Sequence, residues 1–247
     1  MQKMSVSVII PCLNEGNTIY GNIKKINSYL SSNFDIYEII AVNDGSQDNT
    51  VSEIKRFQSD FSSAPLHIID NEINEGKGKV VTDGILKSSH SIVMFLDADL
   101  AIPIEELGKF VREIEGGCDL AIASRFVPGL KIMKPVLWYR KFMERVFRIM
   151  RMVIIDNYTI KDTQCGFKVF RREVAMDIFP LLKVRRFAFD AEIIHIATIR
   201  KYKVKELPIT LQNPTASSIR IIRDSWNMFL DLIRIRLNSS KGYYKKR

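Results

Sequence analysis

Residues 92–99 have the sequence IVMFLDAD, an unbroken apolar run that ends in two aspartates separated by an alanine. Such a run, with no alternating polar residues, is typical of a strand that is buried on both faces of a sheet. Asp97 and Asp99, just past the strand, can point at one cation, and their oxygens suit Mg²⁺ or Mn²⁺. Alone, the pair is weak evidence, because aspartates are also common in turns.

Similar apolar runs recur through the first half of the chain, each followed by a helical pattern. Strands are expected at residues 6–11, 37–43, 66–70, 92–96 and 119–123, and helices at residues 16–30, 48–61, 77–87 and 104–115. This alternation predicts an α/β fold with a Rossmann-like, mostly parallel central sheet flanked by helices. Ligands of such sheets bind beyond the carboxyl ends of the strands.

The second half is less regular. It is expected to contain helices at residues 131–155, 190–202 and 219–237, and strands at residues 166–171 and 204–210. No low-complexity linker divides the chain, and no internal repeat is found. We therefore expect residues 1–247 to form a single domain.

Polar residues follow three of the expected strands, with PCLNE at residues 11–15, NDGS at 43–46 and DAD at 97–99. Because carboxyl ends of parallel strands meet at one edge, these residues are expected to line one crevice. Asp44 could accept a hydrogen bond from the N–H edge of uracil or guanine. The alternative is that Asp44 caps the next helix, but Asp48 can do this itself, which leaves Asp44 available.

Residues 74–79, NEGKGK, open the third expected helix. Glycines allow close backbone approach, and the helix N-terminus together with Lys77 favours an anion. The segment lacks the spacing of a Walker P-loop. A plain turn and helix cap is the alternative interpretation.

Seven segments, taken in order, resemble one known family. Those of the first half are similar to family 2 glycosyltransferases of the GT-A fold: VSVIIPCLNE (6–15), VNDGSQDNT (42–50), NEGKG (74–78) and DAD (97–99). Those of the second half resemble the dolichyl- and polyprenyl-phosphate sugar transferases: SRF (124–126), DTQCGFK (162–168) and FDAE (189–192). Residues 162–168 are most similar to the dolichyl-phosphate β-glucosyltransferase branch, which uses UDP-glucose.

The resemblance implies roles at the matching positions. Asp99 would bind the metal directly, and Asp97 would lie near the metal and the ribose. Arg125 would contact a phosphate, while Gln164 would line the acceptor and sugar side with Asp162 and Asp190. The expected catalytic set is Asp99, Arg125, Asp162 and Asp190. The expected donor-binding set is Pro11, Asn14, Glu15, Asp44, Lys77, Asp97 and Ala98.

The expected reaction is an inverting transfer of a hexose, glucose from UDP-glucose, to a polyprenyl or dolichyl phosphate. A lipid phosphate is already ionised near neutral pH, so the work of the protein is positioning and charge stabilisation. A hydroxyl acceptor would instead require a carboxylate base, for which Asp190 is the candidate. Two alternatives stay open: a GDP-mannose-dependent polyprenyl-phosphate mannosyltransferase, and a family 2 enzyme that acts on a soluble hydroxyl.

Charge divides the chain in two. Residues 1–120 carry 10 Lys+Arg and 18 Asp+Glu, whereas residues 121–247 carry 27 and 10. A basic half is expected to meet an anionic partner. We expect residues 1–123 to bind the nucleotide sugar, residues 124–212 to bind the acceptor, and residues 213–247 to form a basic amphipathic helix and tail.

Two helical segments separate basic from apolar residues. In residues 140–154, one face has Arg140, Lys141, Arg145, Arg148 and Arg151, and the other has Phe142, Val146, Ile149, Met150 and Val153. In the last helix, an apolar arc of Ile219, Ile222, Trp226, Phe229, Leu230, Ile233 and Leu237 lies opposite Arg220, Arg223 and Arg234. Such helices suit a membrane surface, although packing on the sheet is the alternative.

We expect a peripheral enzyme at the cytoplasmic face of a membrane, with a membrane-protein partner or a homo-oligomer as further candidates. No apolar run approaches the ~20 residues that cross a bilayer, and no secretory leader is recognised. The three cysteines form neither a disulfide framework nor a metal site, which fits a reducing compartment. Nucleic acid is not an expected partner, because no zinc spacing or RNA- or DNA-binding motif is found.

Overall fold

The computed structural model describes residues 5–132, 138–155, 159–212 and 221–245. A seven-stranded sheet has the order β3-β2-β1-β4-β7-β5-β8, and β6 and β9 form a small second sheet. The strands are β1 (Ser5–Cys12), β2 (Ile36–Asp44), β3 (Leu66–Asn71), β4 (Ile92–Leu96), β5 (Leu120–Ser124), β6 (Lys131–Ile132), β7 (Phe167–Arg171), β8 (Val204–Pro208) and β9 (Thr210–Leu211). In the large sheet only β7 is antiparallel to its neighbours, so the expected mostly parallel sheet is confirmed.

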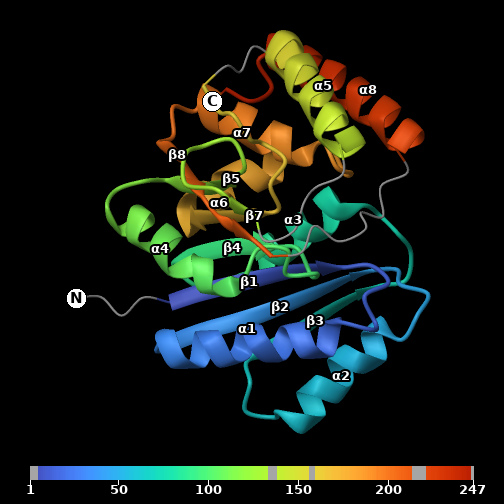
Figure 1. Cartoon of the computed structure of the whole chain (residues 1–247), viewed down its shortest axis with the longest axis vertical. Helices are drawn as coiled ribbons and strands as arrows, with labels where there is room; N and C mark the ends of the chain where they lie inside the picture. Colours follow the sequence, from blue (N-terminus) through green and yellow to red (C-terminus); the bar gives the residue numbers. More distant parts are fainter. Residues whose placement is uncertain (1–4, 133–137, 156–158, 213–220, 246–247) are drawn as a thin grey trace.

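Helices cover both faces of this sheet (Figure 1). They are α1 (Ile19–Asn33), α2 (Thr50–Asp60), α3 (Lys77–Lys87), η1 (Ile104–Glu106) with α4 (Leu107–Glu115), α5 (Trp138–Ile155), α6 (Arg172–Ile178) with η2 (Phe179–Leu181), α7 (Phe189–Ile199) and α8 (Ile221–Ser240). One core joins the sheet to α1, α2 and α4. A second core, on the other face, joins it to α3, α6 and α7 and to the buried side chains of α8 and the end of α5.

The two cores follow from the alternation of side chains along each strand. In β1, Val8 and Ile10 enter the first core, whereas Ile9 enters the second. In β4, Met94 and Phe95 divide in the same way. Because both faces of these two strands are covered, residues 8–10 and 92–96 are apolar without alternation, which explains the apolar runs in the sequence.

Three features of the second half differ from expectation. Residues 131–155 are not one helix, because Lys131–Ile132 pairs with β9 and α5 begins only at Trp138. The single strand expected at residues 204–210 is divided between β8 and β9, which belong to different sheets. The short helix α6 follows β7 without an intervening loop and was not expected. No helix in the described ranges is long and apolar enough to span a bilayer.

Candidate active site

The carboxyl ends of β1, β2 and β4 meet at one edge of the sheet, because these strands are parallel neighbours. After β1 the chain turns through Asn14, whose φ of 55° lies in the left-handed region that asparagine adopts more readily than most residues. The Asn14 side chain accepts a hydrogen bond from the Gln47 N–H (2.9 Å), and its backbone N–H donates to Ser46 Oγ (2.9 Å). These bonds join the loop after β1 to the loop after β2. Pro11 lies at the same edge, in register with Val42.

Asp44 ends β2 and is almost fully buried. Its Oδ1 accepts hydrogen bonds from the backbone N–H groups of Glu75 (2.7 Å) and Gly76 (3.1 Å). Burial raises the pKa of Asp44, although the backbone bonds act in the opposite direction. Asp44 therefore holds the loop that opens α3 and does not cap α2. A carboxylate can accept about four hydrogen bonds, so it retains capacity for a ligand.

Lys77 begins α3 and reaches Asp97 at the end of β4, with 2.5 Å between Nζ and Oδ1. Burial lowers the pKa of Lys77, but the carboxylates of Asp97, Asp190 and Asp99 outweigh it and raise the pKa above its ordinary value. Burial, and then the charges of Asp99 and Asp97, raise the pKa of Glu15. Lys77 and Glu15 are therefore both within electrostatic reach of Asp97 and Asp99.

The Asp97–Asp99 pair has the chemistry of a metal site that the substrate completes. Asp99 Oδ1 accepts a hydrogen bond from the Ala101 N–H at 3.0 Å, and Ala98 between the aspartates packs in the core. Among the described residues, no group of three or more His, Cys, Asp or Glu could hold a metal ion. Mg²⁺ and Mn²⁺ fit this edge, because Mg²⁺ sites typically combine one or two carboxylates with water and substrate phosphates. The Lys77 ammonium on Asp97 supports this, since a cation is already accommodated there.

Gly166 connects this edge to the segment of residues 162–168. Its carbonyl accepts a hydrogen bond from the Asp97 N–H at 3.1 Å, and a Cβ on it would lie 2.1 Å from Asp97 Oδ2. A side chain at position 166 would therefore displace the Asp97 carboxylate. No role was expected for Gly166, although a glycine just before a strand indicates close approach of another group.

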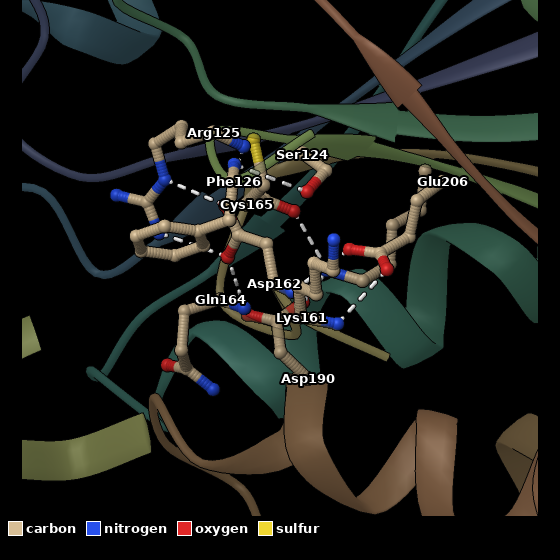
Figure 2. A network of polar contacts seen from close by, with 10 residues as sticks. Ser124, Arg125, Phe126, Lys161, Asp162, Gln164, Cys165, Asp190 and Glu206 are labelled. Carbon is tan, nitrogen blue, oxygen red and sulfur yellow. Dashed lines mark hydrogen bonds and ion pairs between the residues drawn. The ribbon is translucent and has the colours of Figure 1, made fainter. Parts of the chain in front are cut away.

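Arg125 and Asp162, both expected catalytic residues, form a bidentate ion pair (Figure 2). Asp162 accepts from Arg125 Nε (2.7 Å), Nη2 (3.0 Å) and backbone N–H (3.0 Å), and from the Gln164 N–H (3.1 Å). Glu206 on β8 accepts from the N–H groups of Lys161 and Asp162, both at 2.9 Å. Burial opposes ionisation of Asp162, but Arg125 holds its pKa below the ordinary value. Asp162 thus acts as an anchor that orients Arg125.

Asp190 is held by a residue without an expected role. Lys168 on β7 is completely buried, and its Nζ lies 2.5 Å from Asp190 Oδ1 and 2.6 Å from the Cys165 carbonyl. Burial raises the pKa of Asp190, although Lys168 and Lys77 act in the opposite direction. The signal for Lys168 was a lysine within an apolar strand, where a buried charge needs a partner.

Gln164 carries a buried donor. Its Nε2 atom is inaccessible and has no hydrogen-bond partner among the described residues. Leaving such a donor unsatisfied costs about 1–3 kcal/mol. An oxygen of a ligand would satisfy it, and the expected place of Gln164 on the acceptor and sugar side stays a prediction.

In α5, the buried and exposed sides do not follow the expected division into a basic outer face and an apolar inner face. Arg151 is buried and donates to the Ile160 carbonyl at 2.8 Å, whereas Ile149 and Val153 are 54% and 69% exposed. Arg148 lies over the ring of Phe126, 4.8 Å from its centroid. The predicted faces also included residues 140–142, 146, 219, 220, 222 and 223, whose side chains lie outside the described part of the chain.

Helix α8 has apolar residues on two opposite sides. Leu232 and Ile235 are completely buried. Four other apolar side chains are exposed: Trp226 (62%), Leu230 (47%), Ile233 (37%) and Leu237 (53%). At about 100° per residue these four form one stripe, opposite the buried pair. We call this stripe, with Ile149 and Val153 of the neighbouring α5, the outer apolar face.

Residues 7–179 match the family described as glycosyl transferase family 2. The chain belongs to this family. The expected glycosyltransferase activity and the resemblance to family 2 are therefore confirmed.

The chain is also similar to dolichyl-phosphate beta-glucosyltransferases of several organisms. A dolichyl-phosphate beta-glucosyltransferase of Trichomonas vaginalis is 32% identical, with 98% of this chain and 74% of the relative covered. The enzyme of that name from Saccharomyces cerevisiae is 29% identical, with 99% and 78% covered, and the human one is 28% identical, with 97% and 77% covered. Each of these relatives is named as a glucosyltransferase that acts on dolichyl phosphate.

Solved structures support the fold. Glucosyl-3-phosphoglycerate synthase from Mycobacterium tuberculosis, in complex with Mn²⁺, UDP and glucosyl-3-phosphoglycerate, has a TM-score of 0.69 at 16% identity, with 97% of this chain and 80% of that chain covered. Its complex with Mn²⁺, UDP and phosphoglyceric acid has a TM-score of 0.68 at 18% identity, with 99% and 80% covered. The fold of this chain is accordingly the GT-A fold.

Proposed function

We propose that this glycosyltransferase moves glucose from UDP-glucose to a polyprenyl or dolichyl phosphate, with inversion at the anomeric carbon. The observation that carries the proposal is the contact between two parts of the site. Gly166, in the segment that also holds Asp162, packs against Asp97 at the edge with Asp99 and Lys77. A site for a nucleotide diphosphate and a cationic site for an acceptor phosphate therefore adjoin.

On the donor side, Asp97 and Asp99 would hold Mg²⁺ or Mn²⁺, which would neutralise charge on the diphosphate. Lys77 would contact the same diphosphate from the N-terminus of α3, where the helix also favours an anion. Asp44 would read the N–H edge of the base, while Pro11, Asn14 and Glu15 would contact the nucleoside. Ala98 would act only by spacing the aspartates, because its side chain packs in the core.

On the acceptor side, Arg125 would bind the lipid phosphate, oriented for it by Asp162. A phosphate oxygen attacks the anomeric carbon of glucose, the bond from that carbon to the β-phosphate oxygen breaks, and UDP leaves. No proton has to be removed from an ionised phosphate, so neither Asp162 nor Asp190 need act as a base. Their pairing with Arg125 and Lys168 agrees with this.

Transfer assays with radiolabelled UDP-glucose and GDP-mannose, with and without a polyprenyl phosphate, test the proposal. We expect label from UDP-glucose in an organic-extractable product that forms only when the lipid phosphate is present. Label from GDP-mannose instead would favour the mannosyltransferase alternative. A water-soluble labelled product would overturn the lipid acceptor.

We further propose that the outer apolar face docks on the cytoplasmic face of a membrane. Exposed basic residues accompany it, among them Arg145, Arg234, Arg236, Lys241 and Lys245. Each basic residue near an anionic lipid surface contributes about 1 kcal/mol, and exposed Trp and Leu side chains insert at the interface. Anionic lipids are enriched in the cytoplasmic leaflet. The basic charge and the exposed apolar area of this face therefore both fit such a membrane.

Sedimentation with phosphatidylserine-containing vesicles tests the docking. Leu230→Gln should weaken binding about tenfold, because an inserted side chain of this size contributes about 1.5–3 kcal/mol. Leu86→Gln, on α3, is the matched control, since Leu86 and Leu230 are similarly exposed (44% and 47%). Equal loss in both variants would overturn the proposal, as would a stable dimer in solution that Leu230→Gln dissociates, because the face would then be covered by a second copy.

A further inference from the structure

The segment after α8 folds back onto the core. Gly242, with a φ of 73°, turns the chain after the helix. Tyr244 then enters the second core and is completely buried. Its ring packs edge-on against His195, and its carbonyl accepts a hydrogen bond from Arg200 Nε at 3.0 Å. His195 belongs to α7 and Arg200 directly follows it, so the segment after α8 is bound along that helix.

The Tyr244 hydroxyl donates a hydrogen bond to Glu192 Oε1 at 2.6 Å. Glu192 is completely buried, and burial raises its pKa while the hydrogen bonds it accepts lower it. Burial, and then the Glu192 charge, raise the pKa of Tyr244, so the hydroxyl keeps its proton and remains a donor. A charge-assisted bond in a buried setting is stronger than a neutral one.

Glu192 also holds the segment before α7. It accepts the N–H of Lys183 (3.0 Å) and of Val184 (2.8 Å) on Oε2. The tail, through Tyr244 and Glu192, thus orders residues 183 and 184. Loss of the tyrosine hydroxyl would leave Glu192 with one donor fewer in the protein interior.

Residues 184 and 185 in turn lie against the loop that opens α3. The Arg185 carbonyl accepts the Lys79 N–H at 3.1 Å. A Cβ on Gly76 would lie 2.6 Å from the Arg185 carbonyl oxygen, and one on Gly78 would lie 2.7 Å from that of Val184. The approach is so close that both positions require glycine. The same loop donates two N–H groups to Asp44.

We propose that Tyr244 is a positioning residue for the donor loop of residues 74–79. It acts through Glu192 and residues 183–185, and so links the helix of the outer apolar face to the nucleotide-sugar site. The effect on donor affinity rests on the proposed function. The effect on the loop itself rests only on the hydrogen bonds described above.

Hydrogen exchange of the ligand-free protein tests the link without assuming any donor. Tyr244→Phe keeps the ring and removes the hydroxyl, and should speed exchange at residues 183–184 and 75–79 while central strands β1 and β4 stay protected. Tyr243→Phe is the matched control, because it removes a hydroxyl from the adjacent, exposed tyrosine and should change neither segment. Glu192→Gln is a second variant and should show the same selective loss.

Calorimetric titration with UDP and Mn²⁺ is the second readout. Tyr244→Phe should raise the Kd by about threefold to tenfold, the range that coupling through a network of this kind supplies. Faster exchange at residues 183–184 with unchanged exchange at 75–79 would overturn the proposal, as would a uniform loss of protection across the sheet. If the wild type does not bind UDP, the donor assignment fails, while the exchange result still decides the link.

Discussion

Asp162 and Asp190 are both almost fully buried and both ion-paired, yet their pKa values shift in opposite directions. Asp162 accepts four hydrogen bonds, three from Arg125 and one from Gln164. Asp190 accepts from Lys168, whose ammonium also bonds a backbone carbonyl. Several donors outweigh the cost of burial at Asp162, whereas one shared ammonium does not at Asp190.

The two carboxylates therefore have different roles. Asp162 is bound on several sides and orients Arg125. The charges of Lys168 and Lys77 both favour the ionised form of Asp190, and Lys77 itself contacts Asp97 at the end of β4. The ionisation of Asp190 therefore depends on the charges beside Asp97.

A large effect is expected for Asp162→Asn. The variant removes the charged partner of Arg125 from an enclosed pair, and should lower the free energy of unfolding by about 3 kcal/mol. Urea denaturation measures it. A loss under about 1 kcal/mol, the range of surface pairs, would contradict the anchor role.

Gly166→Ala tests whether the segment that contains Asp162 also positions the Asp97 carboxylate. The added Cβ would displace the Asp97 carboxylate, so Mn²⁺-dependent binding of UDP-glucose should weaken about tenfold, which is 1.4 kcal/mol. Gly21→Ala on α1 is the control, because a Cβ there meets nothing within 4 Å. Unchanged donor affinity in Gly166→Ala would show that the contact is not needed.

Asp190→Asn should also cost stability, because it leaves the completely buried Lys168 ammonium without its carboxylate partner. Removing one member of a buried ion pair costs about 3 kcal/mol or more. The same urea experiment measures it. A cost under about 1 kcal/mol would show that Lys168 does not depend on this carboxylate.

The pH dependence gives the smallest effect. Asp162 has a lowered pKa in the folded state, so its contribution is present above its unfolded pKa of about 3.9 and is lost as the pH falls through the folded pKa. Asp190 has a raised pKa, so its contribution is present below about 3.9 and is lost as the pH rises through the folded pKa. The stability difference from wild type should therefore shrink toward acid for Asp162→Asn and toward neutrality for Asp190→Asn. Parallel profiles would contradict this.

The group of polar residues at the ends of β1, β2 and β4 could be predicted from the sequence because its signals are local. The strand at residues 92–96 and the helix at 77–87 have the expected bounds. An apolar run followed by Asp97 and Asp99 places both carboxylates at a strand end. Parallel pairing of neighbouring strands then brings Lys77 and Glu15 to the same place.

The surroundings of Asp162 and Asp190 depend on contacts between distant segments, which a single sequence does not encode locally. Strand β7 inserts between β4 and β5 in the antiparallel direction, and this pairing alone places Lys168 opposite Phe95. The helical wheel of α5 separates Arg151 from Val153, but it does not say which side faces the core. Tyr244, too, is recognised as a buried residue only once α8 is in place.

Calorimetric titration of UDP-glucose with and without Mn²⁺ decides whether Asp97 and Asp99 form a metal-assisted site for a nucleotide sugar. The wild type should bind more tightly with Mn²⁺, and Asp99→Asn should lose that gain while keeping its melting temperature. An undiminished Mn²⁺-dependent gain in Asp99→Asn would show that Asp99 does not hold the metal.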